Sequence, residues 1–351
     1  MSLVRTDRDW RGSGFTLVEM MVALALVSLI ALLLLSMTNS TATIWRQTTG
    51  RIEQFRSADA AFESVTRRLS QATLNTFWDY DNPNAPKKYF RQSDLRFIIG
   101  TMTKGPKPLL TVTSPRRPTH GVFFQAPLGF VDDPANFGGL SNLINTWGYY
   151  VEFNQDVRPK FIEDMPDGLP KRYRYRLMEF MQPSNALSIY SFTSGKPAYT
   201  GKDWFSAGLV PGAPEVLAPS VHVLGENIVA LVLQPKLSKR DEISTGKQLS
   251  KDYAYDSTTT NADPDINPKN QLPPVVQVTL VAIDEASANR LANGAVAPGF
   301  DAMLDAIFFD TSKLDADLNT LQKALSEFKP PVSFRIFTTS VGIRAAKWSR
   351  K

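Results

Sequence analysis

The sequence predicts an α+β protein in which one long N-terminal helix packs on a mostly antiparallel β-sheet domain. No proline interrupts residues 15–74, where apolar residues first run continuously and then recur at helical spacing. After residue 74, short β-rich runs are separated by proline, glycine and asparagine. Strands and helices do not alternate regularly enough for a doubly wound parallel sheet, so an α+β arrangement is the better prediction.

The first half of the predicted helix is apolar enough to cross a membrane. From Gly14 to Leu35 the sequence reads GFTLVEMMVALALVSLIALLLL, with Glu19 as the one charged residue. A helix over residues 15–37 is about 35 Å long, which exceeds the roughly 30 Å of a hydrocarbon core. The leader before it has a small positive excess, which predicts a cytoplasmic N-terminus and a translocated remainder: Arg5, Arg8 and Arg11 against Asp7 and Asp9.

The second half of the predicted helix is amphipathic. Its apolar residues fall on one face at helical spacing, and between them lie charged and amide side chains: Trp45, Ile52, Phe55, Phe62, Val65 and Leu69 form the apolar face. Gly50 weakens the pattern by about 1 kcal/mol relative to alanine. We therefore expect a single helix of up to about 90 Å, whose second half packs on a folded domain.

The entry to the apolar run resembles the N-terminal motif of type IV prepilins and type II secretion pseudopilins. The resemblance is carried by Gly14-Phe15-Thr16-Leu17-Val18-Glu19 and the long apolar run after it. In that family a prepilin peptidase cuts after the glycine and the new N-terminal phenylalanine is methylated, which implies processing between Gly14 and Phe15. The family's glutamate at the fifth mature position falls on Glu19, which implies assembly with other pilin or pseudopilin subunits.

The position of Glu19 also has a physical interpretation. A charged side chain inside a bilayer costs about 2.5–3.5 kcal/mol on insertion scales, so a carboxylate there needs a partner. Cleavage would create an α-amino group at Phe15, about 6 Å from Glu19 along the helix axis. An axial offset between neighbouring subunits would bring one carboxylate to another subunit's amine. An unpaired acid, tolerated by snorkelling or protonation, is the alternative.

Weaker resemblances occur in the rest of the chain. Residues 223–233 resemble a strand entry of PilW-type minor pilins and J-class minor pseudopilins, as do residues 273–281 and 334–341. The long inserts and the layout further resemble the Verru/Chthon cassette protein C group of prepilin-like proteins. The resemblance is strong over residues 11–75, patchy afterwards and absent for much of 80–220.

The expected elements of the globular part follow from composition and periodicity. Residues 173–177 alternate most clearly, which predicts one solvated sheet face, whereas the continuously apolar run 228–233 predicts a central strand. Helices are expected at 285–292 and 312–328. The expected strands are 95–99, 109–112, 122–125, 149–153, 172–181, 187–192, 227–234, 275–283 and 332–343.

These predictions divide the chain into three parts. Residues 1–14 form a cytoplasmic prepilin leader, and residues 15–74 form the long helix, with 15–37 as its transmembrane segment. Residues 75–351 form a periplasmic α+β domain. The expected location is the inner membrane, crossed once, with a cell-surface filament as a later location after assembly.

The sequence offers little for catalysis, so we expect no enzyme activity, no cofactor and no metal site. Without cysteine there are no disulfides or thiolate ligands, and no phosphate-binding loop, HExxH run or Gly-x-Ser-x-Gly elbow occurs. His120 and His222 stand in unrelated contexts. The net charge is +5, but lysine and arginine are scattered among acids, which does not favour nucleic acid as a partner.

One acidic stretch could bind calcium, contrary to the expectation of no metal site. Asp263, Asp265 and Asn267 have the first three ligand spacings of an EF-hand loop. Pro268 stands where that loop needs glycine and Pro274 where it needs glutamate, which excludes an EF-hand. A looser oxygen-ligand calcium site stays open at this point, and residues 252–270 are expected to form a mobile surface excursion.

Together these observations indicate a structural, low-copy minor pilin or pseudopilin of a type IV pilus or type II secretion-like filament. Its globular part is large for a subunit repeated along a shaft. One alternative is a membrane-anchored periplasmic binding or enzymatic domain that enters no filament. A second is a freely secreted protein cut near Ala42, with the apolar run as its signal peptide.

Overall fold

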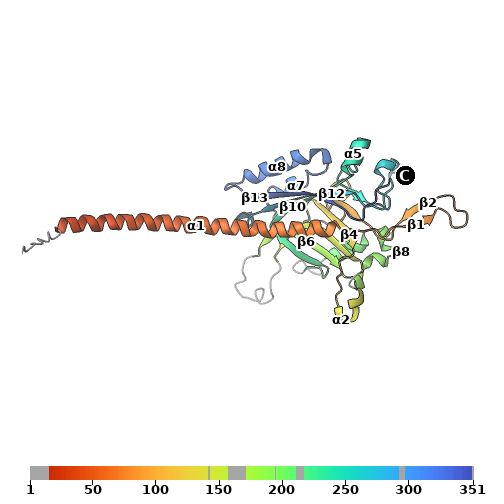
Figure 1. The fold of residues 1–351 in the computed structure, drawn as a ribbon, viewed down its shortest axis with the longest axis horizontal. Helices are drawn as coiled ribbons and strands as arrows, with labels where there is room; N and C mark the ends of the chain where they lie inside the picture. The colour runs from red at the N-terminus through yellow and green to blue at the C-terminus, as the bar shows by residue number, and fades with distance from the viewer. Residues whose placement is uncertain are drawn as a thin grey trace, which may run out of the picture. The chain divides into compact units, whose positions relative to one another are not determined.

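The computed structural model describes residues 16–140, 143–156, 171–193, 195–210, 217–291 and 297–349. By its internal contacts the chain divides into a first unit, Met1–Ile52, and a second unit, Glu53–Lys351. Helix α1, Leu17–Leu69, has residues in both units (Figure 1). The long helix and the antiparallel sheets confirm the predicted α+β class.

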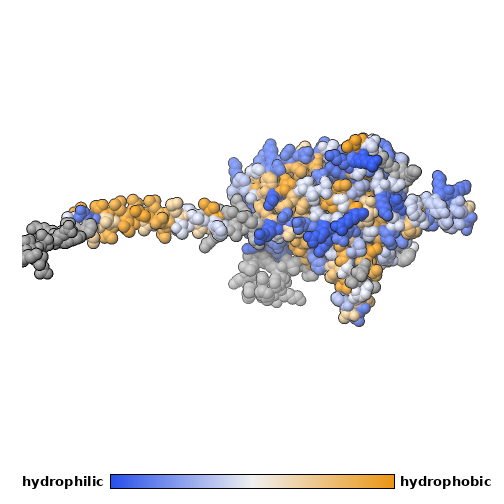
Figure 2. All heavy atoms as spheres, viewed as in Figure 1, coloured by the Kyte–Doolittle hydropathy of each residue, from blue (hydrophilic) through white to orange (hydrophobic). Residues whose placement is uncertain are grey.

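The apolar part of α1 lies in the first unit. Within Leu17–Trp45 the most apolar 18-residue window has a mean hydropathy of 2.7, and the side chains of this stretch are exposed (Figure 2). The hydroxyl of Ser28 donates to the carbonyl oxygen of Leu24, so this polar side chain is satisfied within the helix. Thr38 and Thr43 make the same bond to carbonyls four residues back. Among the described residues this is the one helix long and apolar enough to cross a membrane.

The larger sheet of the second unit has six strands within the described residues, and all neighbouring pairs are antiparallel. In the order in which they lie side by side, they are β11 (Tyr255–Asp256), β3 (Ile98–Thr101), β4 (His120–Ala126), β5 (Asn145–Gln155), β6 (Tyr173–Gln182) and β9 (Val221–Glu226).

A second sheet has three antiparallel strands, in the order β10 (Ile228–Lys236), β12 (Val275–Ile283) and β13 (Phe334–Gly342). Two small hairpins complete the described strands: β1 (Phe77–Tyr80) with β2 (Tyr89–Gln92), and β7 (Phe192–Thr193) with β8 (Lys196–Pro197). Figure 1 shows the β1–β2 hairpin extending away from the rest of the second unit.

Short helices lie in the connections. The predicted helices 285–292 and 312–328 are confirmed by α6 (Glu285–Leu291) and α8 (Leu314–Ser326), and α8 buries Leu314, Leu321 and Leu325. The others are α2 (Pro134–Phe137), α4 (Asp203–Ser206), α5 (Lys239–Thr245) and α7 (Asp301–Leu304), with 3₁₀ turns η1 (Gly138–Leu140), η2 (Ser184–Ala186), η3 (Ser188–Tyr190), η4 (Ala198–Thr200), η5 (Ala207–Leu209), η6 (Pro264–Ile266) and η7 (Thr311–Lys313).

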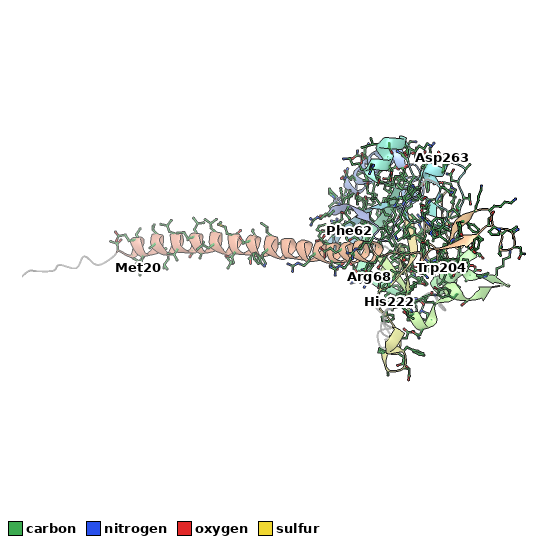
Figure 3. All side chains as sticks on the ribbon, turned by 45° about the vertical axis from the view of Figure 1, so that its right-hand side comes forward. Met20, Phe62, Arg68, Trp204, His222 and Asp263 are labelled. Atoms are coloured by element: carbon green, nitrogen blue, oxygen red, sulfur yellow. The ribbon has the colours of Figure 1, made fainter. Side chains whose placement is uncertain are left out.

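The end of α1 packs on both sheets. Phe62 is buried, and the centre of its ring lies 5.8 Å from that of Phe337 in β13. Arg68 pairs with Glu179 of β6, and its guanidinium carbon lies 4.3 Å from the ring centre of Trp147 in β5. Figure 3 shows Phe62 and Arg68 on neighbouring turns of the helix. The helix from Phe55 to Leu69 is therefore part of the core of the second unit, whereas Trp45, predicted on the same apolar face, is exposed.

Strand β10 is buried, but it is not the central strand that its apolar run predicted. Among the described strands it pairs only with β12, which is the central strand of the smaller sheet. Its free edge faces the start of β4. The amide of Leu231 donates to Thr119 Oγ1 at 3.2 Å and that of Leu233 to His120 Nδ1 at 3.1 Å. These two side chains satisfy edge groups that would otherwise be buried without partners.

The alternating stretch in β6 has no solvated face, contrary to the prediction. Arg174 and Arg176 are 7% and 3% exposed. Arg174 Nη2 lies 2.7 Å from Glu285 of α6, and Arg176 Nη2 donates to the carbonyl oxygen of Gln155 at 2.6 Å. The polar positions of this alternating stretch are therefore buried arginines that have partners. Sequence periodicity alone cannot distinguish such arginines from solvent-exposed ones.

Other local predictions also need correction. Residues 109–112 form no strand, although the amides of Leu109 and Leu110 donate to Thr101 and Met102. Residues 188–190 form a 3₁₀ turn in place of the predicted strand 187–192. The segment 252–270 is packed onto the sheet instead of lying apart from it, because β11 pairs with β3 and the side chains of Tyr253 and Tyr255 are buried.

His120 joins the two sheets in the core. It is fully buried, its Nδ1 accepts from the Leu233 amide, and its Nε2 lies 3.0 Å from the carbonyl oxygen of Phe308. Since a carbonyl oxygen can only accept, Nε2 carries the proton of a neutral ring. Burial lowers the pKa of His120 to about 4.

We expect acid to destabilise the second unit through His120. The unfolded chain takes up this proton near pH 6.5, whereas the folded chain resists it down to about pH 4. The contribution of neutral His120 to stability is therefore complete above pH 6.5 and is lost as the pH falls through this window, by on the order of 3 kcal/mol.

Urea unfolding of the full chain between pH 4 and pH 7 measures this effect. His120→Gln should flatten the pH dependence, whereas the control His222→Gln, at the exposed second histidine, should leave most of it in place. An unchanged slope in His120→Gln would contradict the assignment.

Candidate functional site

Helix α1 begins at a capping box. Thr16 immediately precedes the first helical residue, and its Oγ1 accepts a hydrogen bond from the Glu19 amide at 3.3 Å. Glu19 Oε2 in turn accepts from the Thr16 amide at 2.8 Å and from Thr16 Oγ1 at 2.9 Å. Two amide donors that have no partner within the helix are thus satisfied by side chains. The carboxylate of Glu19 therefore has a local structural function.

This geometry leaves Glu19 able to accept further donors. Both bonds go to Oε2, and among the described residues no donor reaches Oε1. The side chain is exposed. A carboxylate has about four acceptor positions on its two oxygens, so the capping box does not exhaust Glu19.

The two predicted processing residues, Gly14 and Phe15, lie outside the described residues. Their functions therefore stay predictions, as does the assembly function of Glu19. Thr16 was not identified as important from the sequence. The signal was present, because Thr16 and Glu19 have the Thr-x-x-Glu spacing of a capping box before an apolar run.

The comparisons with known proteins agree with this N-terminal interpretation. Residues 11–35 match the family model described as the prokaryotic N-terminal methylation motif. The matched range includes Gly14, Phe15 and Glu19. This match supports a type IV pilin-like protein. It fits prepilin peptidase processing and, with the apolar helix, membrane anchoring. No curated protein and no solved structure matches the chain.

The later segments that resemble minor pilins lie mostly in the smaller sheet, except that residues 223–226 belong to β9 of the larger sheet. Residues 223–233 end in β10, 273–281 contain most of β12, and 334–341 contain most of β13. The family match ends at residue 35. These strands therefore agree with a common sheet but do not identify a subtype.

The side chain of Lys247 lies between two carboxylates of the acidic stretch that was considered for calcium. Lys247 Nζ lies 2.7 Å from Asp263 Oδ2 and 2.8 Å from Asp265 Oδ2. The hydrogen bond from Lys247 holds the pKa of Asp263 below its usual range. Figure 3 marks Asp263 on the second unit. No group of three or more potential metal-ligating side chains occurs among the described residues. The ammonium group thus takes the position a cation would need.

The two histidines lie in separate surroundings. His120 is in the core between the sheets, while His222 is exposed and pairs in register with Glu179 across β9 and β6. Burial raises the pKa of Glu179, and the charge of Arg68 opposes that shift. Figure 3 shows Arg68 and His222 on the same side of the second unit. The ion pair between Arg68 and Glu179 fixes the end of α1 to the larger sheet.

We expect calcium to leave the stability of the chain unchanged. A ligand that binds only the folded state raises the unfolding midpoint by mass action, and the Lys247 ammonium opposes such binding here. Thermal unfolding with calcium chloride and with EDTA should give the same midpoint. The variant Lys247→Ser frees both carboxylates and tests whether calcium can then bind, with exposed Lys251→Ser as its control. A calcium-dependent rise in the unaltered chain would refute the prediction.

Proposed function

We propose that the chain is a structural, low-copy subunit, a minor pilin or pseudopilin, of a type IV pilus or type II secretion-like filament. The observation that carries the proposal is the methylation motif over residues 11–35, which extends from the leader into the apolar part of α1. In this proposal prepilin peptidase cuts after Gly14, Phe15 is N-methylated, and the second unit is periplasmic. The chain acts by assembly and not as an enzyme.

The size of the second unit supports a low-copy position. It extends from Glu53 to Lys351, so a large folded body belongs to each subunit. A shaft repeats its subunits at short axial intervals, and we infer that a body of this size is better suited to the tip region. Because Glu19 is present, the proposal has this subunit rest on a neighbour and not form the outermost position of the filament.

Assembly through Glu19 follows from the cost of burying charge. Cleavage before Phe15 would create a cation in the same membrane layer as the carboxylate, and mutual neutralisation by two subunits would remove the cost for both. Oε1 of Glu19 is the oxygen available for that contact, because Oε2 serves the capping box. The capping box would therefore orient the carboxylate that the neighbour meets.

We expect mass spectrometry of the mature chain to find N-methylated Phe15 as the first residue. Gly14→Ala should retain the leader, because the peptidase recognises the glycine in the family that the motif resembles. Gly138→Ala is a matched control, since a methyl group there meets open space. An intact leader in the native chain would favour the anchored alternative, and a start after Ala42 would favour a secreted protein.

Substitution of Glu19 should separate assembly from helix capping. Glu19→Ala removes both functions and should lower incorporation into sheared filaments by about tenfold or more, as loss of an ion pair in lipid implies. Thr16→Ala removes only the capping partner and should preserve most incorporation. The control Glu63→Ala changes an exposed carboxylate with 71% side-chain exposure. Circular dichroism should show a folded second unit in all three.

Equal losses in Thr16→Ala and Glu19→Ala would assign the effect to the capping box alone. Normal incorporation of Glu19→Ala would contradict the assembly mechanism, while leaving the processing result unaffected.

A further inference from the structure

A cavity lies beside β11, the edge strand of the larger sheet, where it pairs with β3. Its volume is about 620 Å³, within the roughly 300–1,000 Å³ of small-molecule sites. Three segments form its walls: β3, residues 107–109 and the loop 248–268. Lys202 contributes from the start of α4. The site is independent of the N-terminal motif and of the proposed filament function.

Part of the wall is apolar. Ile98, Leu109 and Tyr255 contribute to the lining, and each is less than 5% exposed. The backbone amide of Leu109 donates a hydrogen bond to the carbonyl oxygen of Thr101. Its side chain also lies close to Gly100, where an added Cβ would be 3.0 Å from Leu109 Cδ2. The apolar wall is therefore preformed by the sheet and the strand-like segment next to it.

Lys202 brings an ammonium group to this wall. Its Nζ donates to the carbonyl oxygen of Pro108 at 2.7 Å, and no carboxylate in the described part of the chain lies within 4 Å of it. Burial, followed by the charge of Arg96, lowers the pKa of Lys202, and the charge of Asp256 opposes that shift. Trp204 and Phe205, both buried, hold the backbone on its C-terminal side in the core. The charge is thus half-buried, held in place and not neutralised by a carboxylate.

The carboxylates of the lining are already engaged. Asp256 receives two bonds from Arg96, at 3.0 Å from Nε and 2.5 Å from Nη2. Asp252 Oδ2 lies 3.0 Å from Lys107 Nζ. Each acid is matched by its own cation, so the lining has an excess of positive charge from Lys202 and Lys251, of which Lys251 is exposed and Lys202 is half-buried. An anion that enters the cavity would neutralise it.

We propose that this cavity binds a small organic carboxylate, with its anionic group on the Lys202 ammonium and its apolar part against Ile98 and Leu109. A charge-assisted hydrogen bond to a half-buried ammonium is stronger than a neutral one, which gives the site its preference for an acid. The apolar wall favours a ligand that carries an aliphatic group next to its carboxylate. Two sources have this chemistry: a free aliphatic carboxylate and the C-terminal carboxylate of a polypeptide that ends in an apolar residue.

Acid and amide pairs test the proposal on the full chain in lipid nanodiscs. Hexanoate stands for a free carboxylate and N-acetyl-leucine for a polypeptide end, and hexanamide and N-acetyl-leucinamide are their neutral counterparts. In ligand-observed NMR titrations, an acid that binds this site should have an affinity at least about tenfold above that of its own amide. The acid with the higher affinity identifies the source. Equal affinity for acid and amide, or no saturable binding of either acid, would overturn the proposal.

Substitution of the lysine tests the site itself. Lys202→Gln should lower the affinity for the acids by about tenfold and leave the amides unaffected. Lys202→Arg should retain most of the preference, and Lys196→Gln, at an exposed lysine of β8, should retain all of it. Unchanged acid binding in Lys202→Gln would place the ligand elsewhere and overturn the proposal. Should Lys202→Gln not fold, the comparison of acids with amides on the unaltered chain still decides.

Discussion

The burial of the last turns of α1 against both sheets is the contact on which the second unit depends. Val65 and Leu69 have no exposed surface. Ala61 lies close to Gly225 of β9, where an added Cβ would be 3.1 Å from Ala61 Cβ. Burying a Val or Leu side chain fully stabilises a fold by about 1.5–3 kcal/mol. The same helix includes the apolar segment Leu17–Trp45, so the buried turns and the membrane-type residues belong to one helical segment of the chain.

Buried ion pairs add a second constraint around this core. Arg117 and Glu152 are 3% and 4% exposed at the side chain, and their atoms lie 3.0 Å apart. Arg116 links Asp301 and Asp305 in and beside α7, at 2.7 and 2.6 Å. Removing one member of such a pair costs about 3–5 kcal/mol, because the other charge is left buried and unpaired. These pairs fix the loops and short helices to the larger sheet.

The N-terminal part could be predicted because its signals are local. The apolar run, the single carboxylate and the later helical spacing all lie within residues that are close in sequence, and α1 forms over Leu17–Leu69. The capping box at Thr16 was also local, and the spacing to Glu19 would have identified it. The fold class followed from the change in composition after this helix.

The sheet order and the cavity beside β11 could not be predicted, because both depend on contacts between residues that are distant in sequence. β11 pairs with β3 across more than half of the domain sequence, which converts an apparently free acidic loop into an edge strand. The cavity wall combines Ile98, Lys202 and the 248–268 loop, and no local spacing joins them. Likewise, the arginines at 174 and 176 look solvated until their partners Glu285 and Gln155 are known.

The division of the chain between local and distant signals has a functional consequence. Residues 11–35 carry a motif that requires only a helix and a membrane, so it can be combined with folded units of many kinds. What distinguishes this protein must therefore lie in Glu53–Lys351, where β11 and Lys202 form a cavity far in sequence from the motif. A structural subunit and a ligand-binding unit do not exclude each other here, because the two activities use different residues. Loss of one by substitution at Glu19 or at Lys202 should leave the other intact.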